Sequence, residues 1–209
     1  MTRPDQTRPD HNYYAYLSMW FRPRLTIRRV LEHNPYQGVR LLATILALEN
    51  FFFYANSWSL GLRMNYLAVI LVGVVVSPFW GAVWLWITSH IFYYTGRWLG
   101  GSAPIESLRT AMAWSKIPAV GILISWGCII AIARDEAFIY AGGGSPYIMI
   151  FNSLNFVFAL WSIFTLIQVI KELQDFSSGR SIANLLIAWT LFSGPFIATM
   201  YLILFTLNF

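Results

Sequence analysis

Residues 66–95 read YLAVILVGVVVSPFWGAVWLWITSHIFYYT, thirty positions without one Asp, Glu, Lys or Arg. A helix needs about 20 apolar residues to cross the hydrocarbon core of a bilayer, so this run predicts a transmembrane helix that tilts, bends or protrudes. Pro78 and Gly81 mark where a bend would fall. A re-entrant hairpin is the alternative, although no charged residue interrupts the run.

Four further apolar runs lie on either side of this one, at about 39–58, 113–133, 146–170 and 182–207. They are continuous, whereas the strands of a membrane barrel would alternate apolar and polar positions over about ten residues. We therefore expect an all-α fold, a polytopic membrane bundle of five transmembrane helices with an N-terminal interfacial amphipathic helix. Residues 13–209 would form a single domain. Residues 1–12, in which Thr-Arg-Pro-Asp occurs twice, would be a disordered cytoplasmic tail.

The composition supports a membrane protein and argues against other classes. Of the 209 residues, 57% are hydrophobic and 11% are charged, against about 25% charged in a soluble domain. The single cysteine, Cys128, allows no disulfide within the chain and no cluster of thiolate metal ligands. The net charge of +5 comes without a basic patch that carries a nucleic-acid motif, so we expect no nucleic acid to bind.

The basic residues predict the orientation in the membrane. Twelve of the 14 Lys and Arg residues lie before the first run, between the second and third, or between the fourth and fifth. They are Arg3, Arg8, Arg22, Arg24, Arg28, Arg29, Arg40, Arg97, Arg109, Lys116, Lys171 and Arg180. The other side has only Arg63 and Arg134. Because basic residues concentrate in cytoplasmic loops, the N-terminus is predicted to be cytoplasmic and the C-terminus to lie outside.

An amphipathic stretch precedes the first run. Pro23 suits the first turn of a helix, and in the residues that follow, Leu25, Val30 and Leu31 alternate with arginines. A helix with aromatic residues beside it and Arg on its polar face is typical of one that lies in the membrane surface. The alternative is a helix that packs against the loops of the same protein.

Several polar residues lie within or beside the apolar runs. Glu49 is near the middle of the first run, where a carboxylate is costly unless it is paired or faces water. It is interpreted either as a proton- or ligand-coupling group or as a neutral carboxyl that hydrogen-bonds to neighbouring helices. His90 lies at a comparable depth, so the two side chains could pair directly or through water. Lys116 can snorkel to the cytoplasmic interface.

Asn152 and Asn155 share one face of the fourth run, and Asn184 opens the fifth. Asparagines in such positions commonly join helices by hydrogen bonds, which is the expectation here.

Enzyme signatures are absent from the sequence. The three histidines have no metal-ligand spacing with any Cys, Asp or Glu, and no phosphate-binding loop or Gly-x-Ser-x-Gly motif occurs. The Gly-rich residues 96–101 follow an apolar run rather than a strand, so they predict a helix end and a turn. We expect no catalytic residue, no metal and no cofactor.

Three segments, taken in order, resemble the Yip domain family of five-span membrane proteins, in its prokaryotic branch. They are WFRPRLT at 20–26 with EHNP at 32–35; GRWLGGS at 96–102 with ESLR at 106–109 and AWSKIP at 113–118; and KELQDFS at 171–177. The resemblance implies five spans and a cytosolic N-terminus. Eukaryotic relatives bind Rab-type GTPases, but their Asp-Leu-x-Gly-Pro motif is missing here, where residues 77–80 read SPFW.

We therefore expect a non-enzymatic integral membrane protein, in a bacterial inner membrane with a periplasmic C-terminus. Its role would be membrane organisation, lipid interaction or scaffolding of a partner. Membrane lipids, anionic ones above all, are the expected partners, with a protein partner or a homo-oligomer as further candidates. The alternative is a small transporter, channel or lipid-translocating protein that uses Glu49 and His90. The expected contact surface comprises Arg22, Arg24, Arg28, Arg29, Arg97, Arg109 and Arg180.

Overall fold

The computed structural model describes residues 11–140 and 146–207, and in these ranges the chain forms helices and turns but no strand. The helices are α1 (His11–Phe21), α2 (Pro23–His33), α3 (Val39–Ser57), α4 (Tyr66–Trp98), α5 (Ile105–Trp114), α6 (Ala119–Ala133), α7 (Pro146–Gln174) and α8 (Ser178–Leu207), with short 3-10 helices η1 (Leu60–Leu62) and η2 (Arg134–Phe138). The all-α prediction is confirmed. The expected disordered tail falls mostly outside the described residues, and α1 begins at His11.

Three helical segments of the described chain are long and apolar enough to cross a membrane: Tyr66–Trp98, Ile105–Phe138 and Met149–Gln174. The protein is therefore a multi-pass membrane protein. The runs expected at 39–58, 66–95, 146–170 and 182–207 correspond to α3, α4, α7 and α8. Helix α4 is continuous through Pro78, so the alternative of a re-entrant hairpin is wrong.

The run expected as one helix at 113–133 is instead divided between α5 and α6. Pro118 has no backbone N–H to donate to the carbonyl of Trp114, and the helix breaks at this position, whereas α4 continues through Pro78. Tight turns replace the regular helical bonds: Ile117 N donates to Trp114 O at 3.1 Å, and Ala119 N donates to Lys116 O at 2.9 Å. Lys116 thus lies in the break between α5 and α6, inside the apolar segment Ile105–Phe138.

A stripe of small residues on α4 lets α3 approach closely. Gly73, Ser77 and Gly81 are buried and spaced four residues apart, so they share one face of α4. A Cβ on Gly81 would lie 2.7 Å from the carbonyl carbon of Ala43, closer than real Cβ atoms come. Such small-residue contacts allow backbones to pack directly, which is how membrane helices commonly associate.

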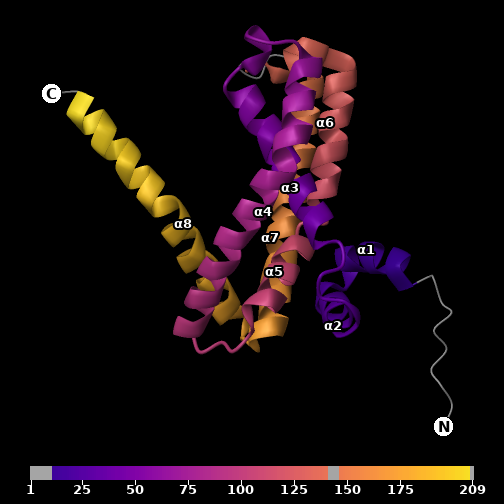
Figure 1. Ribbon diagram of the computed structural model, residues 1–209, viewed down its shortest axis with the longest axis vertical. Coiled ribbons are helices and arrows are strands. Elements are labelled where there is room, and N and C mark those ends of the chain that lie inside the picture. Colours follow the sequence, from indigo (N-terminus) through magenta and orange to yellow (C-terminus); the bar gives the residue numbers. More distant parts are fainter. Residues whose placement is uncertain (1–10, 141–145, 208–209) are drawn as a thin grey trace.

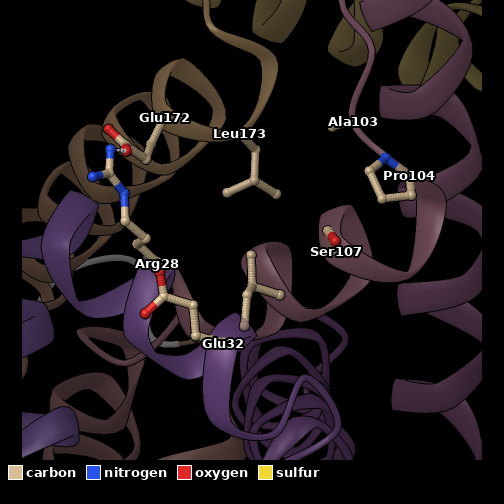
Figure 2. Close-up of a pocket in the computed structure, with 8 residues that line it drawn as sticks. Arg28, Glu32, Ala103, Pro104, Ser107, Glu172 and Leu173 are labelled. Atoms are coloured by element: carbon tan, nitrogen blue, oxygen red, sulfur yellow. Dashed lines mark hydrogen bonds and ion pairs between the residues drawn. The ribbon is translucent and has the colours of Figure 1, made fainter.

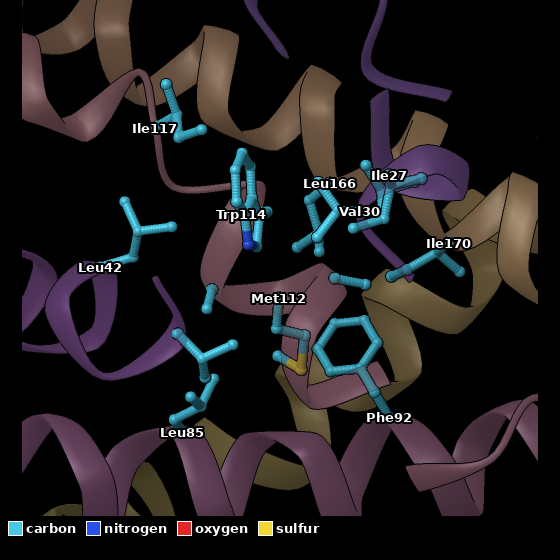
Figure 3. Close-up of a cluster of buried hydrophobic side chains, with 14 of the residues drawn as sticks. Ile27, Val30, Leu42, Leu85, Phe92, Met112, Trp114, Ile117, Leu166 and Ile170 are labelled. Atoms are coloured by element: carbon cyan, nitrogen blue, oxygen red, sulfur yellow. The ribbon is translucent and has the colours of Figure 1, made fainter. Parts of the chain in front are cut away.

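Two apolar cores lie along the bundle. The first gathers buried side chains from α1 to α5, α7 and α8 around Trp114 (Figure 3), whose side chain is completely buried. The second joins α3, α4, α6 and η2 through Phe52, Trp126 and Phe138. In Figure 1, α5 and α6 lie toward opposite ends of the molecule, so the two cores are stacked along its length.

Polar contacts close the end of the bundle that carries η1 and η2. Asn56 Nδ2 donates to the carbonyl of Ala137 at 2.9 Å, and the Asp135 carboxylate accepts from the N–H of Tyr66 at 2.6 Å. The second contact places a negative charge at the N-terminus of α4, where the helix dipole favours it. Toward its C-terminal end, α8 diverges from the other helices (Figure 1).

Candidate functional site

Helix α2 is held in one orientation by its buried face. Pro23 occupies its first turn, and Thr26, Ile27 and Val30 are buried against the bundle, where α2 contacts α5 and α7. One face of α2, which carries Ile27 and Val30, therefore packs on the rest of the protein, as the alternative to a helix lying in the membrane surface predicted. Leu25, which the sequence placed with the apolar face, is exposed instead.

One carboxylate on α7 binds two arginines of α2. Glu172 accepts a hydrogen bond from Nε of Arg24 at 2.9 Å and another from the guanidinium of Arg28. Figure 2 shows the Arg28 side chain reaching from α2 to Glu172. Both arginines are largely exposed, and exposed ion pairs contribute only about 0–1 kcal/mol each, so their main effect is to fix the geometry of α2 on α7.

A cavity of about 340 Å³ lies beside this cluster, between α2, α5, the end of α7 and the segment that follows α4. Figure 2 shows Glu32, Pro104, Ser107 and Leu173 around it. Its charged lining comprises Arg28 with two carboxylates, those of Glu32 and Glu172. Because both signs of charge face this space, it does not select for an anion. In the described part of the chain, no group of three or more His, Cys, Asp or Glu side chains could hold a metal ion.

The Gly-rich segment forms the end of α4 and the turn after it, as the sequence predicts. Gly100 has φ +85°, a left-handed conformation that favours glycine. Gly96 and Gly101 leave space for the side-chain amide of Gln174, which is buried and whose Oε1 accepts from the N–H of Ala103 at 3.2 Å. No pattern in the sequence indicated this role for Gln174.

Two side chains of α5, those of Trp114 and Thr110, form hydrogen bonds to the turn between α2 and α3. The indole N–H of Trp114 donates to the carbonyl of Gln37 at 3.0 Å, and the Thr110 hydroxyl donates to the carbonyl of Pro35. The Tyr16 ring stacks on Trp114 with centroids 4.8 Å apart. These contacts place α1 and α2 together against α5.

The arginines expected to form one contact surface have different environments. Arg24 and Arg28 are paired with Glu172. The Arg97 guanidinium lies over the Tyr93 ring, 5.2 Å from its centroid. Nε of Arg109 is buried without a hydrogen-bond partner among the described residues. Of the seven, Arg22, Arg29 and Arg180 are exposed, and their side chains have no hydrogen bond, ion pair or ring contact with the described residues.

Glu49 and His90 do not pair directly. His90 Nδ1 bonds to the carbonyl of Trp86 at 2.7 Å, within α4, and its ring packs on that indole. Glu49 is half-buried, accepts a hydrogen bond from Asn50 at 3.3 Å and interacts electrostatically with Lys116. Lys116, at the α5–α6 break, is the basic residue whose charge acts on Glu49, although the two form none of the ion pairs found among the described residues.

The asparagines differ in their partners. Asn184 is completely buried and accepts a hydrogen bond from Thr95, which joins α8 to α4. The hydrogen bond expected between helices is thus present at Asn184. Asn152 is exposed, and the buried Oδ1 of Asn155 has no hydrogen-bond partner in the part of the chain that the structure describes.

One comparison with known proteins gives a match. The family model described as the Yip1 domain matches residues 17–205, which include the arrangement above except Tyr16 and the rest of the first six residues of α1 and the last two residues of α8. No curated protein and no solved structure matches the chain.

Proposed function

The chain belongs to the Yip1 domain family, and on that premise we propose that it is a non-enzymatic protein that organises the membrane by binding anionic lipid at its cytoplasmic face. The observation that carries the proposal is the fixed orientation of α2. Its buried face is anchored in the first core, so Arg22 and Arg29 are presented on a rigid surface rather than on a flexible tail.

The proposed topology has five spans, formed by α3, α4, α6, α7 and α8. Helix α4 has 33 residues and is therefore about 50 Å long, against roughly 30 Å of hydrocarbon core. We infer that part of it extends beyond the bilayer on one side, in addition to any tilt or bend, and that this is the cytoplasmic side, which carries α2 and α5. Basic residues concentrate on that side, because only Arg63 and Arg134 lie at the opposite end. The membrane would be a bacterial inner membrane, with the N-terminus cytoplasmic and the C-terminus periplasmic.

Electrostatics supplies the lipid preference in this proposal. A basic residue close to an anionic membrane surface contributes about 1 kcal/mol. Arg22, Arg29 and Arg180 are exposed and form no ion pair with the described residues, so their charges remain available. Glu172 partly neutralises Arg24 and Arg28, which are expected to contribute less.

The experiment compares the lipids retained by the purified full-length chain. The protein is reconstituted in nanodiscs of phosphatidylglycerol and phosphatidylcholine, extracted in mild detergent, and the retained lipids are counted by mass spectrometry. We expect enrichment of phosphatidylglycerol, which the triple variant Arg22→Gln/Arg29→Gln/Arg180→Gln reduces. Equal retention of the two lipids by the wild-type chain would contradict the proposal.

A second candidate function, proton-coupled transport, is supported by the charged neighbours Glu49 and Lys116. The direct contact of His90 with its own helix argues against its relay role. Proton flux into liposomes that is present with the wild-type chain and lost in Glu49→Gln would favour transport over membrane organisation.

A further inference from the structure

A second cavity, of about 350 Å³, lies where α1 ends and α2 begins, against α7. It is separate from the cavity in Figure 2, because the two have no lining residue in common. Its polar lining is formed by Arg22, Arg24 and Gln168, and its apolar lining includes Phe21, Leu25 and Phe164. No carboxylate lines it.

Along α7, the side chains on the face that borders this cavity change from apolar to polar. Trp161, Phe164, Gln168 and Glu172 are spaced three or four residues apart, so they follow one face of the helix. Their side chains pass from aromatic to amide to carboxylate in that order. Trp161 donates its indole N–H to the carbonyl of Trp20 at 3.2 Å, which fixes the end of α1 beside the aromatic part. An apolar-to-polar sequence of this kind is typical of a helix that passes from hydrocarbon into the headgroup layer.

Arg22 and Arg24, which line this cavity, have N–H donors that no described residue accepts. Arg24 donates to Glu172 through Nε at 2.9 Å, and its terminal nitrogens form no hydrogen bond with any described residue. The Arg22 side chain likewise has no ion pair or hydrogen bond within the described ranges. Two guanidinium groups and one amide therefore border the cavity with donors available to an anion.

We propose that this cavity binds one anionic phospholipid, with its phosphate held by Arg22, Arg24 and Gln168 and an acyl chain lying along Phe164. The lining has a guanidinium at Arg22 that pairs with no described residue, and Arg24 keeps free donors although Glu172 partly neutralises its charge, so the lining matches a phosphate. The other cavity has two carboxylates beside its single arginine. The exposed apolar surface favours a lipid over free phosphate: Phe21 is 83% exposed, and Phe164 and Leu160 are each about half exposed. A water-soluble anion would leave these side chains uncovered.

This inference rests on the proposed function, since it assigns the lipid contact of the cytoplasmic face to one discrete site. Diffuse attraction would depend on every exposed basic residue in nearly equal measure. A site depends instead on the residues that line it. Arg29 provides the matched comparison, because it lies on the same helix, is exposed and lines neither cavity.

The test is a titration of the full-length chain, in a neutral detergent, with phosphatidylglycerol, followed by native mass spectrometry. Arg22→Gln and Gln168→Glu are compared with Arg29→Gln. The first removes a phosphate donor, and the second adds a carboxylate to the lining without a large change in volume. Each is expected to weaken binding of the first lipid about tenfold, which is the effect of losing one charge-assisted hydrogen bond. Arg29→Gln removes a charge that acts on the lipid only by diffuse attraction, so it is expected to weaken binding distinctly less than Arg22→Gln does.

Each other outcome overturns the inference in a different way. If Arg29→Gln weakens binding as much as Arg22→Gln, the contact is diffuse, and the proposed function survives without the site. If the wild-type chain binds phosphatidylglycerol no better than phosphatidylcholine, both proposals fail. If millimolar inorganic phosphate displaces the lipid from the wild-type chain, the pocket is a phosphate site. Thermal unfolding of each variant in the same detergent shows that its fold is retained.

Discussion

The side-chain amide of Gln174 fills the space that a Cβ at Gly101 would need: the amide carbon would lie only 2.7 Å from that Cβ. The same amide would be 3.0 Å from a Cβ at Gly96, so the two glycines form the two sides of its site. The end of α7 is thereby connected to the end of α4 through a buried polar side chain that is bonded to Ala103.

Gly101→Ala is expected to destabilise the protein by about 1–3 kcal/mol, because the added methyl group displaces the Gln174 amide from a packed site. The measurement is thermal unfolding of the purified chain in detergent. Gly179→Ala is the matched control, since a Cβ there meets nothing within 4 Å. A decrease in the unfolding temperature of the same size in both variants would show that the amide packing is not the cause.

Gly81→Ala is expected to weaken the packing of α3 on α4. Its Cβ would meet the backbone of Ala43, which cannot move aside as a flexible side chain would, so the two helices must separate. Gly127→Ala, on α6, provides the comparison because a Cβ there has open space. The same unfolding assay should show a lower temperature for Gly81→Ala alone; unchanged stability would mean that the helices separate at negligible cost.

Trp114→Phe is expected to cost about 1–3 kcal/mol, because it leaves the Gln37 carbonyl without its donor and reduces the volume of the first core. Trp98→Phe serves as control, since that indole is largely exposed at the end of α4. Intrinsic fluorescence during denaturation reports the difference. Equal midpoints for the two variants would show that the bond to Gln37 contributes no net stability.

Glu172→Gln is expected to loosen α2 from α7, because one substitution removes the charged partner of both Arg24 and Arg28. Trypsin should cleave after these arginines about two- to fivefold faster, in keeping with the small energies of exposed ion pairs. Glu32→Gln, which also removes a carboxylate near α2, should leave the rate unchanged. High salt should accelerate cleavage of the wild type but not of Glu172→Gln; acceleration of both would contradict the ion-pair explanation.

Glu49 and Lys116 are expected to be energetically coupled. Either single variant, Glu49→Gln or Lys116→Gln, leaves the other charge without its neighbour, whereas the double variant leaves neither. The double variant should therefore be more stable than the sum of the two single effects predicts, by about 0.5–3 kcal/mol. Additive effects in the unfolding assay would show that the two charges do not interact.

Apolar run length predicted the helices well, because membrane helices must satisfy their backbone hydrogen bonds internally. The run expected at 39–58 agrees with α3 to within one residue. The break between α5 and α6 was missed, since Pro118 lies in an apolar run that hydropathy alone reads as continuous. Lys116 was consequently placed within a continuous helix, although it lies at that break.

Contacts between distant residues were beyond the sequence pattern. The composition of α2 showed its two faces but could not show that α5 and α7 cover Ile27 and Val30. The depth of His90 suggested a contact with Glu49, but depth along two helices does not determine which faces meet. The hydrogen bond of Asn184 was easier to predict, because a buried amide in an apolar helix requires a hydrogen-bond partner.

The contact between Arg24 and Glu172 spans 148 residues of sequence, and this separation has a consequence for biosynthesis. At a translation rate of about 5–20 residues per second, Arg24 is synthesised roughly 7–30 s before Glu172. Throughout that interval α2 lacks the part of its binding surface that α7 supplies. Helix α2 can therefore reach its final position only after α7 has been made, so a helix near the start of the chain is completed by one that is synthesised much later.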